Sequence, residues 1–549
     1  MKKANRITAL ALISALLLAA CGNSGGSTAA TAAPAETAKA AETQAAAASE
    51  TKAAETQAPA AAEAPAAEDS TLKVIQNVDP ETFQPGTNDD QACQRVLIQI
   101  YDQLFRYDEN GELQPWLAES YEWDDDTHLR LHLREGVKFS DGSDFTAEDV
   151  VWTIQHSIEE ALPNSHFNII NADDCTIEDD LTCVLGLKYA CGTMPNHLAS
   201  DECAIASKKA FEEFNGDYMN GAAVGTGPYK LVDYVPGDII KMTANEYYWR
   251  EGEPKMKNLD IRIVSSSESA ATEARTLDYD IVIGANSREF DQIDAIDGVH
   301  MDIGQTAKTV YLLLNTKKPP MDNPKVREAF ARAIDVKQTV MVSYGSVGHP
   351  AEAFIVPGIA GCNPDTYYKY FGTGHDVETA KALLAEAGYA DGIDLEIVTE
   401  SYDVQRADMA EAMQAQVLDA GINLSILKLE NGPMREYIDG GNHQMAIFGF
   451  TAQTMEADGF LAQIQPGSVN LNRIGYDRQE FFDTYQKGCA TIDDAERAQI
   501  WEDCLEMLME DYVCVPLNHE RKGAAVRDDV KGFWWAKDYE EIYFANCYK

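Results

Sequence analysis

An alternation of strand and helix patterns between residues 394 and 430 constrains the fold of this chain most. Residues 394–400 (DLEIVTE) and 422–430 (INLSILKLE) have the composition of buried strands, and residues 408–421 (DMAEAMQAQVLDAG) have helical character. Two strands joined through a helix form the β-α-β unit of a parallel sheet. The sequence therefore predicts an α/β protein.

The segment after this unit is a candidate ligand-binding loop. Residues 444–450 (QMAIFGF) are predicted to form the next strand, and the polar stretch TAQTMEAD follows at 451–458. Ligands of open α/β sheets bind beyond the carboxyl ends of strands. We therefore expect residues 451–458 to face a ligand.

Other elements follow from periodicity and turn residues. Strands are expected at 71–78, at 129–133 and on both sides of a Pro236–Gly237 turn. Amphipathic helices are expected at 94–107, after an N-cap at Thr146 with Asp149 three residues on, at 323–335 and at 377–389.

The first residues have the pattern of an export signal. Lys2, Lys3 and Arg6 precede an apolar run that ends at Ala20, directly before Cys21. This junction resembles a bacterial lipobox, which implies a cleaved leader at 1–20 and a lipid on Cys21. The alternative is an ordinary signal peptide in which Cys21 has no role. Residues 21–70 are rich in Ala, Thr, Glu and Pro, so a disordered tether is expected there.

The composition argues against a nucleic-acid partner. Lys and Arg number 44 against 90 Asp and Glu, giving a formal net charge of −46. Phosphate binding needs a positive patch, and the sequence has no basic block. Most of the acidity is interpreted as solvated surface, and attraction of cationic ligands is the alternative.

The chain has eleven cysteines and no C-x-x-C motif, so zinc ribbons and thioredoxin-type sites are not indicated. Cys175 and Cys183 lie symmetrically about the Glu178–Asp180 turn. If this segment is a hairpin, a disulfide between them is feasible. Two free buried thiols are the alternative.

Five long segments together resemble one family. They are IYDQLFRYDENGELQPWLAESYEW, LHLREGVKFSDGSDFTAEDVVWTI, GTGPYKLVDYVPGDIIKMTANEYYW, VYLLLNTKKPPMDNPKVREAFARAID and ETAKALLAEAGY. In this order they are similar to extracellular solute-binding proteins of the peptide and nickel-binding class, the receptors of ABC importers. The resemblance covers residues 71 to 549.

The resemblance implies a two-lobed α/β fold of the periplasmic-binding-protein type with an additional subdomain on the first lobe. We expect lobe I at 71–113, 224–314 and 513–549, the extra subdomain at 114–223, and lobe II at 315–512. Crossovers are expected at Asn315–Thr316 and at 512–516.

The resemblance also implies a ligand site. Peptide-binding members carry an Asp after the strand matched by QMAIFGF, and it pairs with the ligand's amino group. That position falls on Gln453, which cannot form the ion pair. Either Glu456 or Asp458 supplies the carboxylate, or the ligand has no free amine there. The remaining alternative is that both carboxylates face solvent at the rim of the cleft. The carboxylate-binding Arg of dipeptide receptors has no clear match, since Arg406 comes late in its segment. The expected ligand contacts are Phe450, Thr451, Gln453 and Glu456 from lobe II, with Asp90 and Gln91 from lobe I.

We therefore predict a monomeric, lipid-anchored, extracytoplasmic receptor that captures a peptide or peptide-like solute for a membrane permease. No cofactor is expected. An enzyme is disfavoured because H-E-x-x-H, a complete G-x-S-x-G and a Walker A motif are missing, and S-x-x-K at Ser425–Lys428 falls in a predicted strand. A receptor for a nickel or metal chelate, or for another metabolite, is the alternative. Its candidate histidines, His128, His132 and His443, lack evident partners in the cleft.

Overall fold

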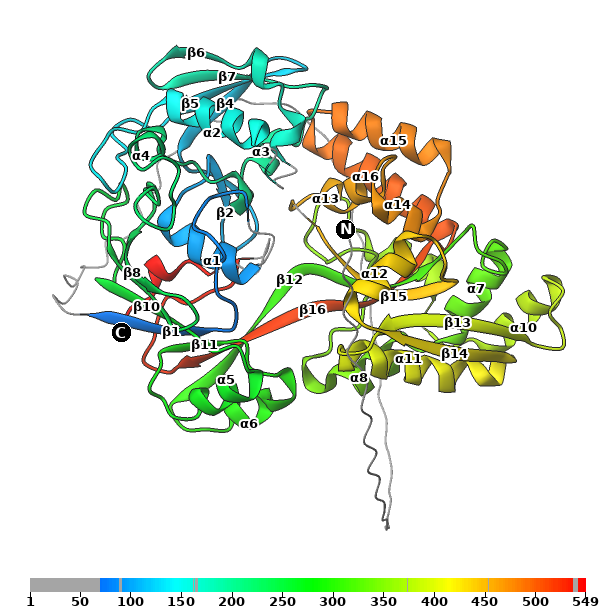
Figure 1. Cartoon of the computed structure of the whole chain (residues 1–549). Helices are drawn as coiled ribbons and strands as arrows, with labels where there is room; N and C mark the ends of the chain where they lie inside the picture. The colour runs from blue at the N-terminus through cyan, green and yellow to red at the C-terminus, as the bar shows by residue number, and fades with distance from the viewer. Residues whose placement is uncertain are drawn as a thin grey trace, which may run out of the picture. The chain divides into compact units, whose positions relative to one another are not determined.

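The computed structural model describes residues 70–87, 91–160, 162, 166–372, 374–452, 454–536 and 542–549. Its main element is a ten-stranded sheet with the order β14-β13-β15-β12-β16-β11-β1-β10-β9-β8 (Figure 1). Strands from distant parts of the sequence are therefore neighbours. We call the half with β1 and β8–β11 lobe I and the half with β13–β15 lobe II.

Lobe I is built around strand β1 (Thr71–Gln76), which pairs in parallel with β10 (Asn258–Ile263) and β11 (Ile281–Ile283). The strands β8 (Tyr229–Val235) and β9 (Ile239–Ala244) flank the predicted turn at Pro236–Gly237 and continue the sheet to its edge. Its helices are α1 (Gln91–Ile100), α5 (Ser267–Ala274) and α6 (Phe290–Asp294).

The helix expected at 94–107 ends earlier, at Ile100. The Ile100 carbonyl accepts a hydrogen bond from the Gly227 backbone nitrogen, and residues 105–107 form strand β2 against β3 (Leu113–Pro115). A contact from far along the sequence therefore stops a helical pattern that continues locally.

Lobe II contains the predicted β-α-β unit. Strand β13 (Ile393–Glu400) pairs in parallel with β14 (Ile422–Leu429) and β15 (Met445–Thr451), and α11 (Val404–Val417) joins β13 to β14. The other helices are α7 (Pro324–Ala333), α8 (Val336–Tyr344), α9 (Pro364–Phe371), α10 (Val377–Glu386), α12 (Asn431–Asp439), α13 (Asp458–Leu461), α14 (Val469–Ile474), α15 (Gln479–Ala490) and α16 (Asp494–Glu510). The strands and helices predicted for this region are confirmed within a few residues at their ends.

Two long antiparallel strands, β12 (Val299–Leu314) and β16 (Cys514–Arg527), connect the lobes (Figure 1). Strand β16 pairs with β11 of lobe I at 524–526, whereas β12 pairs with β15 of lobe II at 308–314. Their mutual register shifts between Gln305 and Thr309. The crossovers predicted at 315–316 and 512–516 fall at the lobe II ends of these two strands, at Leu314 and Cys514, and they stay a prediction. The residue ranges given for the lobes stay a prediction.

The extra subdomain has its own four-stranded antiparallel sheet, ordered β4-β5-β7-β6. Its elements are β4 (Ala118–Asp125), β5 (His128–Leu133), α2 (Ala147–Glu159), β6 (Thr176–Asp179), β7 (Thr182–Gly186), α3 (Met194–His197) and α4 (Lys208–Glu213). The capping interaction predicted for α2 is present: the Thr146 backbone nitrogen donates to Asp149 Oδ2 over 3.1 Å.

The suggested Cys175–Cys183 disulfide is absent, and both residues are free thiols in the structure. The hairpin exists, but its register pairs Cys183 with Ile177, so the two cysteines are not cross-strand partners. Burial raises the pKa of the Cys183 thiol to about 12. Of the two possibilities left by the sequence, the structure has the free thiols.

Candidate functional site

Two cavities lie where the lobes meet beside the crossover strands. The larger has a volume of about 570 Å³, and the smaller about 370 Å³. Trp535 borders both. Clefts of this size between domains are typical ligand sites.

The larger cavity is polar and lined from both lobes. Lobe I supplies residues that follow the carboxyl ends of β1 and β11: Asn77, Val78 and Gly284 to Ser287. Lobe II supplies Tyr344, Asp403, Gln405 and Thr451. A solute in this cavity touches both halves of the sheet.

Thr451 is the predicted contact that the structure does place on this cavity. It ends β15 opposite Lys308 of β12, which also borders the cavity. Gly449 makes room for this lysine: a Cβ at Gly449 would lie 2.9 Å from Lys308 Cε. Because Gly449 has no side chain, the side chain of Lys308 can cross β15 next to the predicted loop.

Ion pairs surround Lys308. Its Nζ lies 2.8 Å from Glu520 Oε2. Burial alone would raise the pKa of Glu520, but Lys308 and Lys522 outweigh it and hold that pKa at about 2. Glu520 therefore carries its charge throughout the physiological range.

Arg406, which the sequence could not assign, does not border either cavity. Its guanidinium lies 3.0 Å from Glu400 Oε2 and 3.1 Å from Asp403 Oδ2. Asp403 also caps α11 by accepting from the Arg406 backbone nitrogen. Arg406 thus neutralises Asp403, a carboxylate in the wall of the larger cavity.

The smaller cavity is mainly aromatic and aliphatic. Its lining residues are Asp302, Gly304, Gln305, Val356, Pro357, Ile359, Met455, Phe533, Trp534 and Trp535. A Cβ at Gly304 would lie 2.2 Å from Trp535 Cγ, so the indole packs directly on the β12 backbone. Only glycine permits this contact.

Phe450, a predicted ligand contact, is a core residue. Its ring lies 5.7 Å from that of Tyr311 and 5.8 Å from that of Phe460, measured between centroids. It borders neither cavity. Phe448 is a third aromatic neighbour, so this ring stabilises the end of β15, and its contact with a ligand stays a prediction.

Glu456, another predicted ligand contact, is buried and fully bonded. Only 8% of it is exposed. Arg497 donates from Nε and Nη2 to the two carboxylate oxygens over 2.7 and 2.6 Å, and Trp501 Nε1 donates over 3.0 Å. Asn196 Nδ2, from the extra subdomain, adds a fourth bond over 3.0 Å. A carboxylate that already accepts four hydrogen bonds has no acceptor site left for a ligand amine, nor does it face solvent.

Asp458 is likewise buried and hydrogen-bonded. It is 2% exposed, and its Oδ2 lies 3.1 Å from His197 Nε2. Burial alone would lower the pKa of His197, but the hydrogen bond and charge of Asp458 raise it to about 10. His197 is therefore cationic, and its Nδ1 lies 2.8 Å from Nδ1 of His166, whose pKa burial lowers to about 3. Protonated His197 donates to both neighbours.

The bonds from Asn196 to Glu456 and from His197 to Asp458 form what we call the α3 contact, between α3 of the extra subdomain and lobe II. It also includes a 2.7 Å hydrogen bond from the Gly192 backbone nitrogen to the Cys489 carbonyl. Figure 1 shows α3 next to α13 and α15. The carboxylates that the sequence suggested for ligand binding are instead used to join two parts of the fold.

A second connection, the α6 contact, joins lobe I to lobe II beside the larger cavity. Ser346 Oγ donates to Asp291 Oδ1 over 2.9 Å, and Arg288 Nη2 donates to Asp408 Oδ2 over 2.8 Å. Ser346 and Asp291 are exposed at the surface.

Several predicted residues lie outside the described part of the chain. These are Cys21, Asp90 and Gln453, and for Gln91 only the backbone is described, as the first residue of α1. Their predicted roles therefore stay predictions.

The histidines considered for a metal do not gather. His128 and His132 lie on β5 beside Asp125 and Glu122, and His443 is buried with its Nε2 bonded to the Arg473 carbonyl. Among the described residues no cluster of three or more His, Cys, Asp or Glu has the geometry of a metal site.

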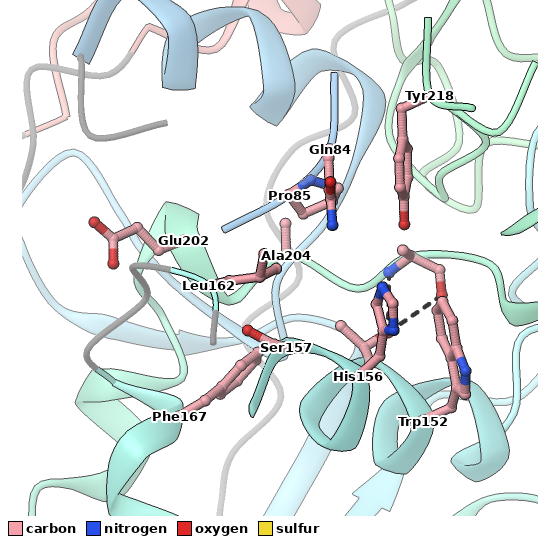
Figure 2. Close-up of a pocket in the computed structure, with 12 residues that line it drawn as sticks. Gln84, Pro85, Trp152, His156, Ser157, Leu162, Phe167, Glu202, Ala204 and Tyr218 are labelled. Carbon is pink, nitrogen blue, oxygen red and sulfur yellow. Dashed lines mark hydrogen bonds between the residues drawn. The ribbon is translucent and has the colours of Figure 1, made fainter. Parts of the chain in front are cut away.

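A third pocket lies between α2 and the residues around Ala204. Figure 2 shows Trp152 and His156 of α2 on one side and Pro85 nearby, with Phe167 and Leu162 toward the other end. The space is only about 10 Å³, which is room for about one water molecule. It is a packing defect of the subdomain and too small for a solute.

Sequence reasoning missed Lys308, Arg521 and the Trp534–Trp535 pair. The signals were present: a lone lysine at the start of the apolar run TVYLLL, and three consecutive aromatics in GFWWAK. Neither signal identifies a site unless one knows that β12 and residues 533–535 lie side by side. Within the residues that the structure describes, no helix is long and apolar enough to cross a membrane.

Comparison with known proteins agrees with this architecture. The glutathione-binding protein GsiB of Escherichia coli K12 is 26% identical over 469 residues, covering 83% of this chain and 90% of GsiB. A dipeptide-binding protein of Pseudoalteromonas sp. SM9913, solved with Met-Leu, superposes with a TM-score of 0.71 at 23% identity, covering 87% of this chain and all of that one. CtaP, an ABC transporter substrate-binding protein of Listeria monocytogenes, gives a TM-score of 0.78 at 20% identity, covering 87% and 99%.

These neighbours establish the predicted fold, a two-lobed α/β architecture of the periplasmic-binding-protein type. The family described as bacterial extracellular solute-binding proteins, family 5, matches residues 112–471, more than half of the 549-residue chain. This chain belongs to family 5 of the bacterial extracellular solute-binding proteins.

Proposed function

We propose that this protein captures a peptide or peptide-like solute between lobes I and II and delivers it to the membrane permease of an ABC importer. The observation that carries the proposal is the larger cavity, whose lining comes from both lobes next to the two crossover strands. Rotation of the lobes about such strands opens and closes a site without covalent chemistry.

The relatives support the solute class. GsiB is named as a glutathione-binding protein, and glutathione is a small peptide with two carboxylates. The Pseudoalteromonas structure holds a dipeptide. The polar lining and volume of the larger cavity suit a solute of this size and chemistry.

The proposal includes an anchor. Cleavage before Cys21 and lipidation of that residue would hold the protein on the outer face of the cell membrane, and residues 21–70 would let the lobes reach the permease. The residue ranges predicted for lobes and subdomain belong to the same proposal. Cys21→Ser should release the protein from the membrane fraction into the soluble fraction, and membrane retention of the variant would contradict the anchor.

The solute is best identified from the protein itself. Protein purified without refolding is denatured mildly, and released molecules are analysed by mass spectrometry, with protein denatured and refolded before analysis as the control. Peptides in the first sample alone support the proposal. A single non-peptide metabolite or a metal chelate would replace the peptide assignment, while leaving the receptor architecture in place.

A further inference from the structure

The two cavities differ in charge. The larger is lined by four cationic residues, Arg95, Lys308, Arg521 and Lys522, and by two carboxylates, Asp403 and Glu520. Both carboxylates have cationic partners, in Arg406 and Lys308. Among the described lining residues cations therefore outnumber carboxylates four to two, in a chain whose formal charge is −46.

Arg521 contributes a positive field from β16. Burial is the main cause that lowers the pKa values of His349 and His519, and the charge of Arg521 lowers both further. The pKa of His519 falls to about 3. Lys308 reaches the same cavity from β12, beside Thr451. Cations from both crossover strands thus border one space, an arrangement that favours a carboxylate over a neutral group.

The smaller cavity has the opposite character. Asp302 is its single charged lining residue among the described ones, and burial raises the pKa of that carboxyl. Gln305 Nε2 is buried there without a hydrogen-bond partner in the described part of the chain. A buried donor without a partner is costly, and a ligand carbonyl would satisfy it.

Trp535 separates the two spaces and borders both. With Trp534, Met455 and Ile359 it provides an apolar surface on the side of the smaller cavity. Such a surface lowers the free energy of a solute that carries an apolar side chain.

We propose that the site selects a short acidic peptide, oriented with a carboxylate near Lys308 and Arg521 and with an apolar side chain and the amino end near Trp534, Trp535 and Asp302. This inference rests on the proposed function and specifies its substrate class. It also assigns the amine-binding role to a carboxylate on β12 in place of Glu456 or Asp458.

The test is calorimetric titration of the purified protein with Ala-Leu-Glu, its neutral counterpart Ala-Leu-Gln, and N-acetyl-Ala-Leu-Glu. We expect the acidic peptide to bind about tenfold more tightly than the neutral one, which corresponds to one charge-assisted hydrogen bond. Acetylation should weaken binding by a similar factor. Equal affinity for the Glu and Gln peptides, or preference for Gln, would overturn the inference.

Four variants sharpen this test. Arg521→Gln should remove most of the preference for Glu, and Glu520→Gln should increase it, since it deletes a negative charge beside Lys308. Asp302→Asn should reduce the effect of acetylation and leave the Glu preference intact. The control is Lys317→Met, because Lys317 pairs with Asp477 on the surface away from both cavities.

The failures are distinguishable. If peptides bind but neither charge nor these variants matter, the substrate class is wrong and the receptor function stands. If no peptide of the panel binds and the purified protein releases only a non-peptide molecule, the peptide-capture function fails together with this inference.

Discussion

The α3 contact and the α6 contact both join lobe II to the rest of the protein, yet they are built differently. The α3 contact contains the buried pair His197–Asp458 and the bond from Asn196 to Glu456, a buried carboxylate that Arg497 of lobe II also holds. The α6 contact consists of one hydrogen bond and one ion pair at the surface. Exposed pairs contribute about 0–1 kcal/mol, whereas removal of one member of a buried pair costs about 3–5 kcal/mol.

The difference between the two contacts shows which side of the molecule is rigid. The α3 contact fixes the extra subdomain on lobe II, so it resists separation. The α6 contact lies beside the larger cavity and opens at low cost, so it is the better candidate for solute entry.

The largest effect should come from Glu456→Gln. The change leaves the buried Arg497 guanidinium without its bidentate carboxylate, and we expect a loss of about 3–5 kcal/mol in the free energy of unfolding. Urea denaturation followed by circular dichroism measures it. The matched control is Asp494→Asn, because Asp494 binds the same arginine but is 91% exposed, and little change is expected there. Equal losses in both variants would refute the comparison.

His197→Gln should be next, with a loss of about 2–4 kcal/mol at pH 6. The pKa of His197 is raised to about 10 in the folded protein and is near 6.5 when unfolded. Its stabilisation is therefore complete below about pH 6.5 and declines as the pH rises toward 10. Urea titrations at pH 6 and 9.5 should show the difference between wild type and variant shrinking at the higher pH. A constant difference would mean that His197 is not charged in the fold.

Gly192→Ala should introduce a steric clash into the α3 contact. The new Cβ would lie 2.3 Å from the Thr491 carbonyl oxygen, and overpacking of this kind costs about 1–3 kcal/mol. Small-angle scattering should show a larger radius of gyration if the contact opens. Gly432→Ala is the control, since nothing lies within 4 Å of its Cβ position. An unchanged radius and stability for Gly192→Ala would show that the backbone yields there.

The smallest effect is expected for Arg288→Ala in the α6 contact. Its ion pair with Asp408 is exposed, so the free energy of unfolding should fall by less than about 1 kcal/mol, and less still at high salt. Thermal unfolding at low and high ionic strength measures both. A loss comparable with that of Glu456→Gln would place the rigid contact on this side instead.

The fold was predictable because its elements are locally encoded. The apolar periodicity of residues 394–430 and the Pro236–Gly237 turn each specify structure within a short window. Helix α1 is the exception, and its end depends on Gly227, more than a hundred residues away.

Of the predicted contacts, Thr451 is the one among the described residues that borders either cavity. Glu456 and Asp458 have the chemistry of ligand groups, but Asn196 and His197, some 260 residues earlier, already occupy them. Whether a carboxylate is available to a solute depends on such distant partners, which no local pattern reveals. The same reason hid Lys308, whose side chain packs beside Gly449 on the neighbouring strand.

The position of β16 in the sheet has a consequence for the order in which this protein matures. Lobe II is built from a continuous stretch, so its strands β13, β14 and β15 can assemble as soon as they are synthesised. The sheet around β1 must wait, because β11 pairs with residues 524–526 and α1 bonds through Gln99 to Ile542 and Phe544. The half of the molecule that is translated first is thus finished last.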